Sequence, residues 1–103
     1  MDEEKKDCCC SRHTKKRTPE ELKCLMNRLK RIEGQVRGLQ RMLENDAYCP
    51  DVLMQSAAVT AAMNGFNKEL LSSHIRTCVA EGVRSGNDEV IDELVATIQK
   101  LMR

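Results

Sequence analysis

Residues 22–43, LKCLMNRLKRIEGQVRGLQRML, decide the fold of this chain. Apolar side chains recur here at alternating steps of three and four residues, the heptad pattern of a helix that packs along one seam. The seam residues are Leu22, Leu25, Leu29, Ile32, Val36, Leu39 and Leu43. About three heptads are present, so the stretch predicts a long amphipathic helix that needs partner helices to cover its apolar side.

Signals for helix ends surround this stretch and predict two further helices. Thr18-Pro19-Glu20-Glu21 combines a capping threonine, a proline and a glutamate, which is typical of a helix start. Asn45-Asp46 breaks the heptads, and Ser85-Gly86-Asn87 indicates a second turn. The predicted helices cover about 19–45, 50–83 and 88–102. No alternating strand pattern occurs, so the predicted fold class is all-α with three helices per chain.

The chain has 103 residues, enough for one small domain. Residues 1–17 are polar and aperiodic, and they predict a disordered arm that is basic and cysteine-rich. Residues 18–103 predict a single three-helix domain. The first two helices can pair as an antiparallel hairpin, and two hairpins packed as a four-helix-bundle dimer would cover the heptad seam.

Charge is distributed unevenly along the chain. The net charge is only +1, yet residues 5–41 carry twelve Lys or Arg against four acids, and residues 42–103 carry five against nine. A basic half indicates an anionic partner, although a solvated charged helix face would give the same pattern. No segment is apolar for long enough to span a bilayer or to act as a signal peptide, so we expect a cytoplasmic protein with no membrane partner. Cysteines stay reduced in that compartment, so the six cysteines are expected to be ligands or sensors.

Cys49, His74 and Cys78 have the residue types and spacing of a metal site shared between two chains. His74 and Cys78 lie four residues apart in a predicted helix, so they share a face and can bind one ion together. Cys49 lies 25 positions before His74, which is about 37 Å along the same helix. It could join the pair only from a second copy, and a two-fold axis would create two such sites. This soft ligand set favours Cu(I), with Zn(II) or Ni(II) as alternatives.

Simpler explanations exist for these residues. A lone cysteine is often a small buried hydrophobic residue, and a lone histidine on a helix is often a surface residue. The arm contains a cluster that could form an accessory metal site, lend His13 as a fourth ligand, or be a thiol-rich tail without function. Its members are Cys8, Cys9, Cys10 and His13. Cys24 lies near the heptad seam and is expected to pack there.

Three separate motifs carry a resemblance to a known family. They are NRLKRIEGQVRG at 27–38, Tyr48-Cys49 followed by Asp51-Val52-Leu53, and His74-x3-Cys78-Val79. Together they resemble the CsoR/RcnR family of bacterial transcriptional repressors over about residues 20–103. The resemblance implies a homotetramer, a dimer of dimers without a helix-turn-helix, whose apo form binds operator DNA and represses.

Within this family the ligand set decides the inducer, and Cys49, His74 and Cys78 resemble the copper-sensing branch. The resemblance implies that Cu(I) binds Cys49 of one protomer with His74 and Cys78 of the other, releases the DNA and derepresses copper-efflux genes. Tyr48 and Glu93 match residues that surround the ligands and couple the site to DNA release.

The first helix supplies the basic surface that the resemblance places against DNA. The candidate DNA contacts are Arg28, Lys30, Arg31, Gln35, Arg37 and Arg41. Glu89 is an alternative to Glu93 as the glutamate of the third helix.

Several other functions fit the same residues. The chain could be a thiol or persulfide sensor, a Ni(II) sensor of the same family, or a cytosolic copper buffer or chaperone that uses the arm cysteines. Enzyme activity is not expected, because no nucleophile–base or acid–base pair is evident.

Overall fold

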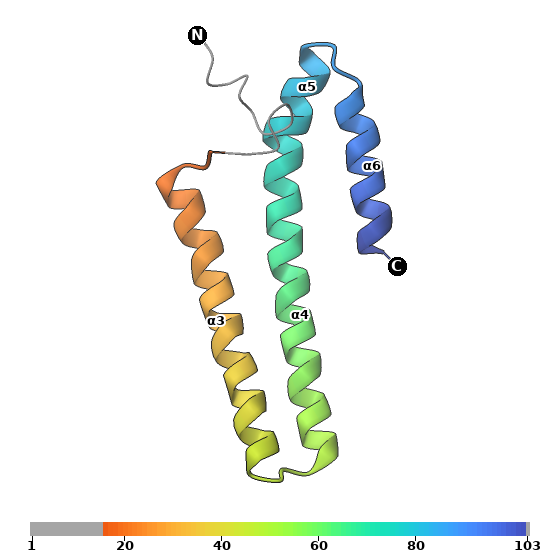
Figure 1. Cartoon of the computed structure of the whole chain (residues 1–103). Helices are drawn as coiled ribbons and strands as arrows, with labels where there is room; N and C mark the ends of the chain where they lie inside the picture. Colours follow the sequence, from red (N-terminus) through yellow and green to blue (C-terminus); the bar gives the residue numbers. More distant parts are fainter. Residues whose placement is uncertain (1–15, 103) are drawn as a thin grey trace. The chain divides into compact units, whose positions relative to one another are not determined.

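The computed structural model describes residues 16–102, and this part of the chain is helical apart from its ends and turns (Figure 1). In chain order the elements are α3 (Pro19–Glu44), α4 (Cys49–His74), η1 (Ile75–Val79), α5 (Ala80–Arg84) and α6 (Glu89–Leu101). No strand occurs in the described residues, which confirms the all-α class. The predicted accessory cluster of Cys8, Cys9, Cys10 and His13 lies outside them.

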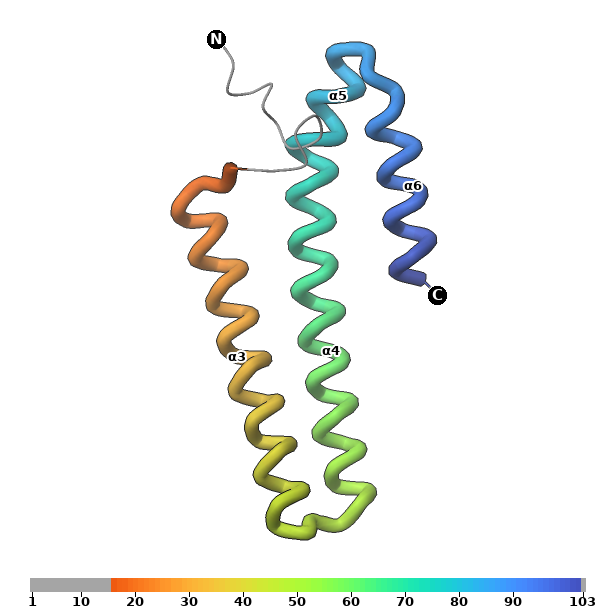
Figure 2. The backbone as a smooth tube through the Cα atoms, viewed as in Figure 1, coloured from red at the N-terminus to blue at the C-terminus, as the bar shows by residue number. Residues whose placement is uncertain are grey.

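The chain divides into two compact units. One unit is Thr18–Leu70, in which α3 and most of α4 form an antiparallel hairpin (Figure 2). The other unit includes Leu71–Arg103, with the end of α4, then η1, α5 and α6. The candidate ligands are therefore distributed over both units, with Cys49 in the hairpin unit and His74 and Cys78 in the other.

Local sequence fixes the start of α3. Thr18 has an extended backbone, and its Oγ1 accepts a hydrogen bond of 3.1 Å from the Glu21 N–H. Pro19 follows at the first helical position, where an N–H would have no partner within the helix, so the proline costs no hydrogen bond. Glu20 and Glu21 add negative charge near the helix N-terminus, which the helix dipole favours.

A tight turn joins α3 to α4. The Ala47 N–H donates to the Met42 carbonyl at 2.9 Å, and the Asp46 N–H donates to the Leu43 carbonyl at 3.2 Å. This pair of bonds is a Schellman motif, which requires a left-handed residue after the helix. Asp46 fills that position with a φ of 55°. The Asp51 and Val52 N–H groups then donate to the Tyr48 carbonyl, so α4 begins directly behind Tyr48.

One turn of the helical segment that begins at Cys49 is a π turn. In η1 the Ala80 N–H donates to the Ile75 carbonyl, five residues back, where an α-helix would use the fourth. Thr77 Oγ1 also donates to the Ser73 carbonyl at 2.8 Å, and such hydroxyl bonds to the preceding turn often bend helices. Apolar spacing alone does not distinguish a π turn from an α turn, and π turns occur frequently at functional sites.

The second unit has its own small core. Cys78 is 2% exposed, Val79 is 5% exposed and Val90 is 2% exposed. Helix α6 packs against both η1 and α5, which buries Val90 on one side and Cys78 and Val79 on the other. A second Schellman turn connects α5 to α6, with Gly86 in the left-handed position at a φ of 86°.

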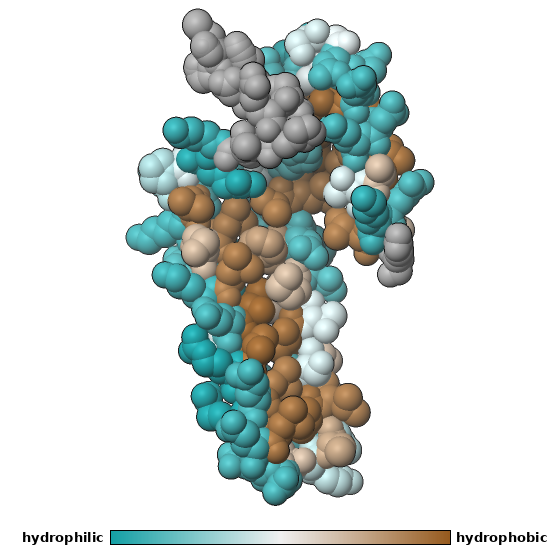
Figure 3. Space-filling view, viewed as in Figure 1, coloured by the Kyte–Doolittle hydropathy of each residue, from teal (hydrophilic) through white to brown (hydrophobic). Residues whose placement is uncertain are grey.

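The heptad seam of α3 is only partly covered in a single chain. Leu25 and Ile32 are buried, whereas Leu22, Val36 and Leu43 of the same seam stay exposed. Figure 3 shows the hydrophobic side chains gathered in a band along the α3–α4 hairpin. None of the described helices has an apolar stretch long enough to cross a membrane.

Candidate metal centre and nucleic-acid surface

His74 and Cys78 stand on either side of the α4–η1 junction. His74 is the last residue of α4 and is half-buried, whereas Cys78 lies in η1 and is almost fully buried. An i→i+5 turn holds more residues than an α turn, so a residue four positions on falls just short of one full turn. The two side chains therefore remain on one side of the helix, which two ligands of one ion require.

The residue before Cys78 contributes one neighbour of the Cys78 sulfur. Thr77 Oγ1 lies 3.6 Å from Cys78 Sγ while it bonds to the Ser73 carbonyl. Cys78 is disulfide-bonded in this structure, and Cys24 and Cys49 are the free cysteines within residues 16–102. Metal binding needs Cys78 as a thiolate, so a metal-binding form requires the reduced protein.

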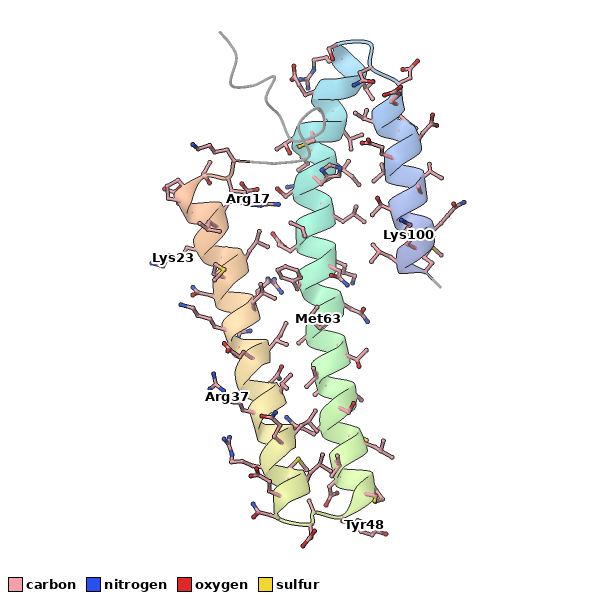
Figure 4. The ribbon with its side chains drawn as sticks, viewed as in Figure 1. Arg17, Lys23, Arg37, Tyr48, Met63 and Lys100 are labelled. Atoms are coloured by element: carbon pink, nitrogen blue, oxygen red, sulfur yellow. The ribbon has the colours of Figure 1, made fainter. Side chains whose placement is uncertain are left out.

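Cys49 lies far along the sequence from the other two candidate ligands. It is the first residue of α4, whereas His74 is the last residue of this helix of 26 residues. Its thiol is free and exposed, and the neighbouring Tyr48 is 72% exposed (Figure 4). Within residues 16–102 of one chain, no three His, Cys, Asp or Glu side chains gather closely enough to hold a metal ion. A site built from two chains therefore stays a prediction.

The predicted glutamate partner of Tyr48 lies on α6. Glu93 and the alternative Glu89 are both exposed, and Asn87 Oδ1 accepts a hydrogen bond of 3.2 Å from the Glu89 N–H. Because Glu89 is the first residue of α6, it belongs to the turn that begins the helix, whereas Glu93 lies one turn further in. Tyr48 lies in the hairpin unit, so its coupling to either glutamate also stays a prediction.

A stripe of basic residues runs along α3 on the side away from the seam. We call Lys30, Arg37 and Arg41 the outward stripe, because their spacings of seven and four residues place them on one helix face. All three are exposed, and Figure 4 shows Arg37 on the side of α3 turned away from α4. Arg37 pairs with Glu33 at 3.4 Å, while Lys30 and Arg41 take part in none of the ion pairs among residues 16–102. Two uncompensated cations therefore face solvent.

Arg28 and Gln35 lie on a different face of α3 from the outward stripe. The Arg28 guanidinium reaches toward α4, where it pairs with Glu69 at 3.9 Å and lies beside Gly65. Gln35 Oε1 is buried without a hydrogen-bond partner among the described residues. Arg31, the remaining DNA candidate, is exposed on α3.

Two contacts of these units involve residues that sequence reasoning missed. Glu69 is separated from Arg28 by more than forty residues, so no local spacing links the two. Gly82 lies against Val90 of α6, and a side chain there would collide with it. A glycine inside a predicted helix was the only available signal for the second contact.

Comparisons with known proteins agree on one family. A sequence model of the family described as "metal-sensitive transcriptional repressor" matches residues 21–100. The copper-sensing transcriptional repressor CsoR of Bacillus subtilis (strain 168) is 50% identical over 80 residues, which covers 77% of this chain and 79% of that protein. The copper-sensing transcriptional repressor RicR of Mycobacterium tuberculosis (strain ATCC 25618 / H37Rv) is 46% identical over 79 residues, which covers 74% and 82%.

Two solved structures are similar over most of the chain. The copper-sensing repressor CsoR with Cu(I) from Geobacillus thermodenitrificans NG80-2 has a TM-score of 0.83 and 43% identity, covering 87% of this chain and 95% of that one. The nickel-responsive transcriptional regulator InrS has a TM-score of 0.70 and 32% identity, covering 82% and 96%.

Proposed function

This chain belongs to the metal-sensitive transcriptional repressor family, and we propose that it is a Cu(I)-responsive repressor of copper-efflux genes. Its apo form binds operator DNA, and the Cu(I)-bound form releases it. The observation that carries the proposal is the soft ligand set in a chain that is 50% identical to a copper-sensing repressor.

The residues present fit Cu(I). Cys49 of one protomer, with His74 and Cys78 of the other, would supply two thiolates and one imidazole. Three soft ligands suit a trigonal Cu(I) site, whereas structural Zn(II) usually takes four ligands. The exposure of the free Cys49 thiol supports its use between chains, because it is open to a second protomer.

The exposed seam supports assembly into at least a dimer. Leu22, Val36 and Leu43 continue the line of the buried Leu25 and Ile32 but remain uncovered in one chain. A second hairpin packed against the first would bury them in a four-helix bundle. A dimer of such dimers would present several copies of α3, and their outward stripes would bind DNA phosphates.

The two binding events are coupled through the protein. If Cu(I) weakens operator binding by some factor, operator DNA must weaken Cu(I) binding by the same factor. Coupling of about 1–3 kcal/mol is typical of such linkage. Equal Cu(I) affinity with and without operator DNA would contradict the repressor mechanism while leaving the metal site itself in place.

The metal site is tested by X-ray absorption on the reduced, Cu(I)-loaded protein. Wild type should show two sulfur ligands and one nitrogen ligand, and Cys49→Ala should lose one sulfur. Cys24→Ala is the matched control, because Cys24 is the other free, exposed cysteine of the described chain and is not a predicted ligand. Loss of a sulfur in Cys24→Ala instead would place the site elsewhere.

The sharing of the site between chains is tested by complementation. Cys49→Ala and Cys78→Ala should each bind Cu(I) weakly alone. In a heterodimer of the two variants, one site keeps all three ligands while the other site loses both thiolates. Random mixing should therefore restore about one quarter of the wild-type sites. A site contained within one chain would show no recovery.

Ni(II) is the second candidate inducer, and the similarity to a nickel-responsive regulator favours it. Ni(II) prefers square-planar coordination, so it would need a fourth ligand beyond Cys49, His74 and Cys78. Operator release measured with each metal under reducing conditions separates the two inducers. Release by Ni(II) but not by Cu(I) would replace copper in the proposal.

A further inference from the structure

A close contact between α5 and α6 lies one helical turn beyond Cys78. An ideal Cβ built on Gly82 would lie 2.7 Å from both γ-carbons of Val90 and 3.2 Å from its Cβ. Non-bonded carbon atoms are most stable at about 3.5–4.0 Å, so any side chain at position 82 would force α6 away. Gly82 is therefore required by the present packing of α6.

Val90 cannot avoid such a side chain by changing its rotamer. A valine in a helix strongly prefers one χ1 rotamer, and both of its γ-carbons meet the Gly82 site. Val90 is also 2% exposed, so it is enclosed on its other sides. Strain at position 82 would have to be relieved by movement of the α6 backbone.

The backbone on the α5 side of the contact is also fixed. The Gly82 carbonyl accepts hydrogen bonds from the Asn87 N–H at 2.8 Å and from Ser85 Oγ at 3.1 Å. Asn87 Oδ1 in turn accepts the Glu89 N–H at 3.2 Å, one residue before Val90. The turn and the Gly82–Val90 contact thus hold α6 in one register on α5.

This packing extends to the candidate ligand. Gly82 lies four residues after Cys78, so the two residues share a helix face. Helix α6 packs on η1 as well as on α5, and Cys78 is buried in the same small core as Val90. A shift of α6 would therefore change the packing around Cys78.

We infer that Gly82 and Val90 are positioning residues for the metal site, which hold Cys78 in its binding position by fixing α6 on the π turn. This inference rests on the proposed function, because it assigns Cys78 to a Cu(I) site. Neither residue can bind the ion itself, so their effect must pass through Cys78. Residues that support metal ligands typically change metal affinity by about 10–100-fold when they are replaced.

The test is a Cu(I) competition titration on the reduced, full-length protein. Gly82→Ala should lower Cu(I) affinity by about tenfold or more, and X-ray absorption should show weakened or lost coordination by one sulfur. Adding Val90→Ala removes both γ-carbons that the new methyl group meets, so the double variant should bind Cu(I) more tightly than Gly82→Ala alone. Circular dichroism at the titration temperature must show each variant fully folded, so that a loss of Cu(I) affinity is not a loss of fold.

Arg84→Ala is the matched control. Arg84 lies on the same short helix, its side chain is 71% exposed, and among residues 16–102 its one ion pair is with Glu81 at 2.9 Å. Its replacement should leave Cu(I) affinity unchanged. If Gly82→Ala fails to fold by circular dichroism, Val90→Ala alone must lower Cu(I) affinity relative to Arg84→Ala.

The outcomes separate the inference from the proposed function. If Gly82→Ala is folded and binds Cu(I) as tightly as wild type, the inference is overturned and the repressor assignment stays intact. If Gly82→Ala is unfolded, wild-type Cu(I) affinity in Val90→Ala has the same meaning. A wild-type protein that binds no Cu(I) under reducing conditions would refute the proposed function, and the inference with it.

Discussion

The two faces of α3 lead to different expected effects on DNA binding. Arg41 is exposed on the outward stripe and takes part in no ion pair among residues 16–102, whereas Arg28 is turned toward Glu69 and Gly65. Each phosphate contact contributes about 0.9 to the slope of log affinity against log salt concentration. With two copies of α3 on the DNA, Arg41→Ala should reduce this slope by about 1.8.

This difference in slope is large enough to measure. Between about 0.05 M and 0.2 M salt, a slope of 1.8 corresponds to about a 12-fold change in affinity. Fluorescence anisotropy with labelled operator DNA across this range gives the slopes for wild type, Arg41→Ala and Arg28→Ala. Arg28→Ala should keep the wild-type slope, because its guanidinium faces α4. Equal losses of slope in the two variants would refute the assignment of the outward stripe as the phosphate-binding face.

Three further predictions concern the stability of the fold. Ile32→Ala should lower the free energy of unfolding by about 2–5 kcal/mol in a urea titration, because Ile32 is 7% exposed and its loss leaves a cavity in the seam. A cost below about 1 kcal/mol would show that the seam is not packed. Thr18→Ala should lower the free energy of unfolding by about 1 kcal/mol, because it removes the hydrogen bond from the Glu21 N–H. Thr18→Ser should keep most of this stability, and equal losses in the two variants would exclude the cap as the cause. Asp46→Gly should raise the thermal midpoint by a few degrees, because Asp46 has a φ of 55° that glycine adopts more easily; a lower midpoint would contradict this.

Much of the fold is encoded in short stretches of sequence. The heptads of α3 and the Thr18 cap act over three or four residues, so spacing alone reveals them. The candidate ligands His74 and Cys78 are also found this way, because their separation is itself a helical spacing.

The remaining features depend on contacts between distant residues. The Arg28–Glu69 ion pair and the Gly82–Val90 contact join different helices, and no periodicity within either helix predicts them. The sequence alone does not divide the basic residues of α3, whereas packing against α4 separates Arg28 from the outward stripe. The π turn at η1 is also not predictable from the sequence, because apolar spacing does not indicate which carbonyl each N–H bonds to.

The placement of Cys49 and His74 at the two ends of α4, taken with the proposed site between two chains, predicts how the protein responds to its own abundance. A binding site completed by a second chain exists only in the associated protein, so metal affinity depends on protein concentration by mass action. Dilution below the dimer dissociation constant would therefore abolish the response even with every ligand intact. The metal would in turn hold the dimer together, so that the same ion signals copper excess and maintains the assembly that detects it.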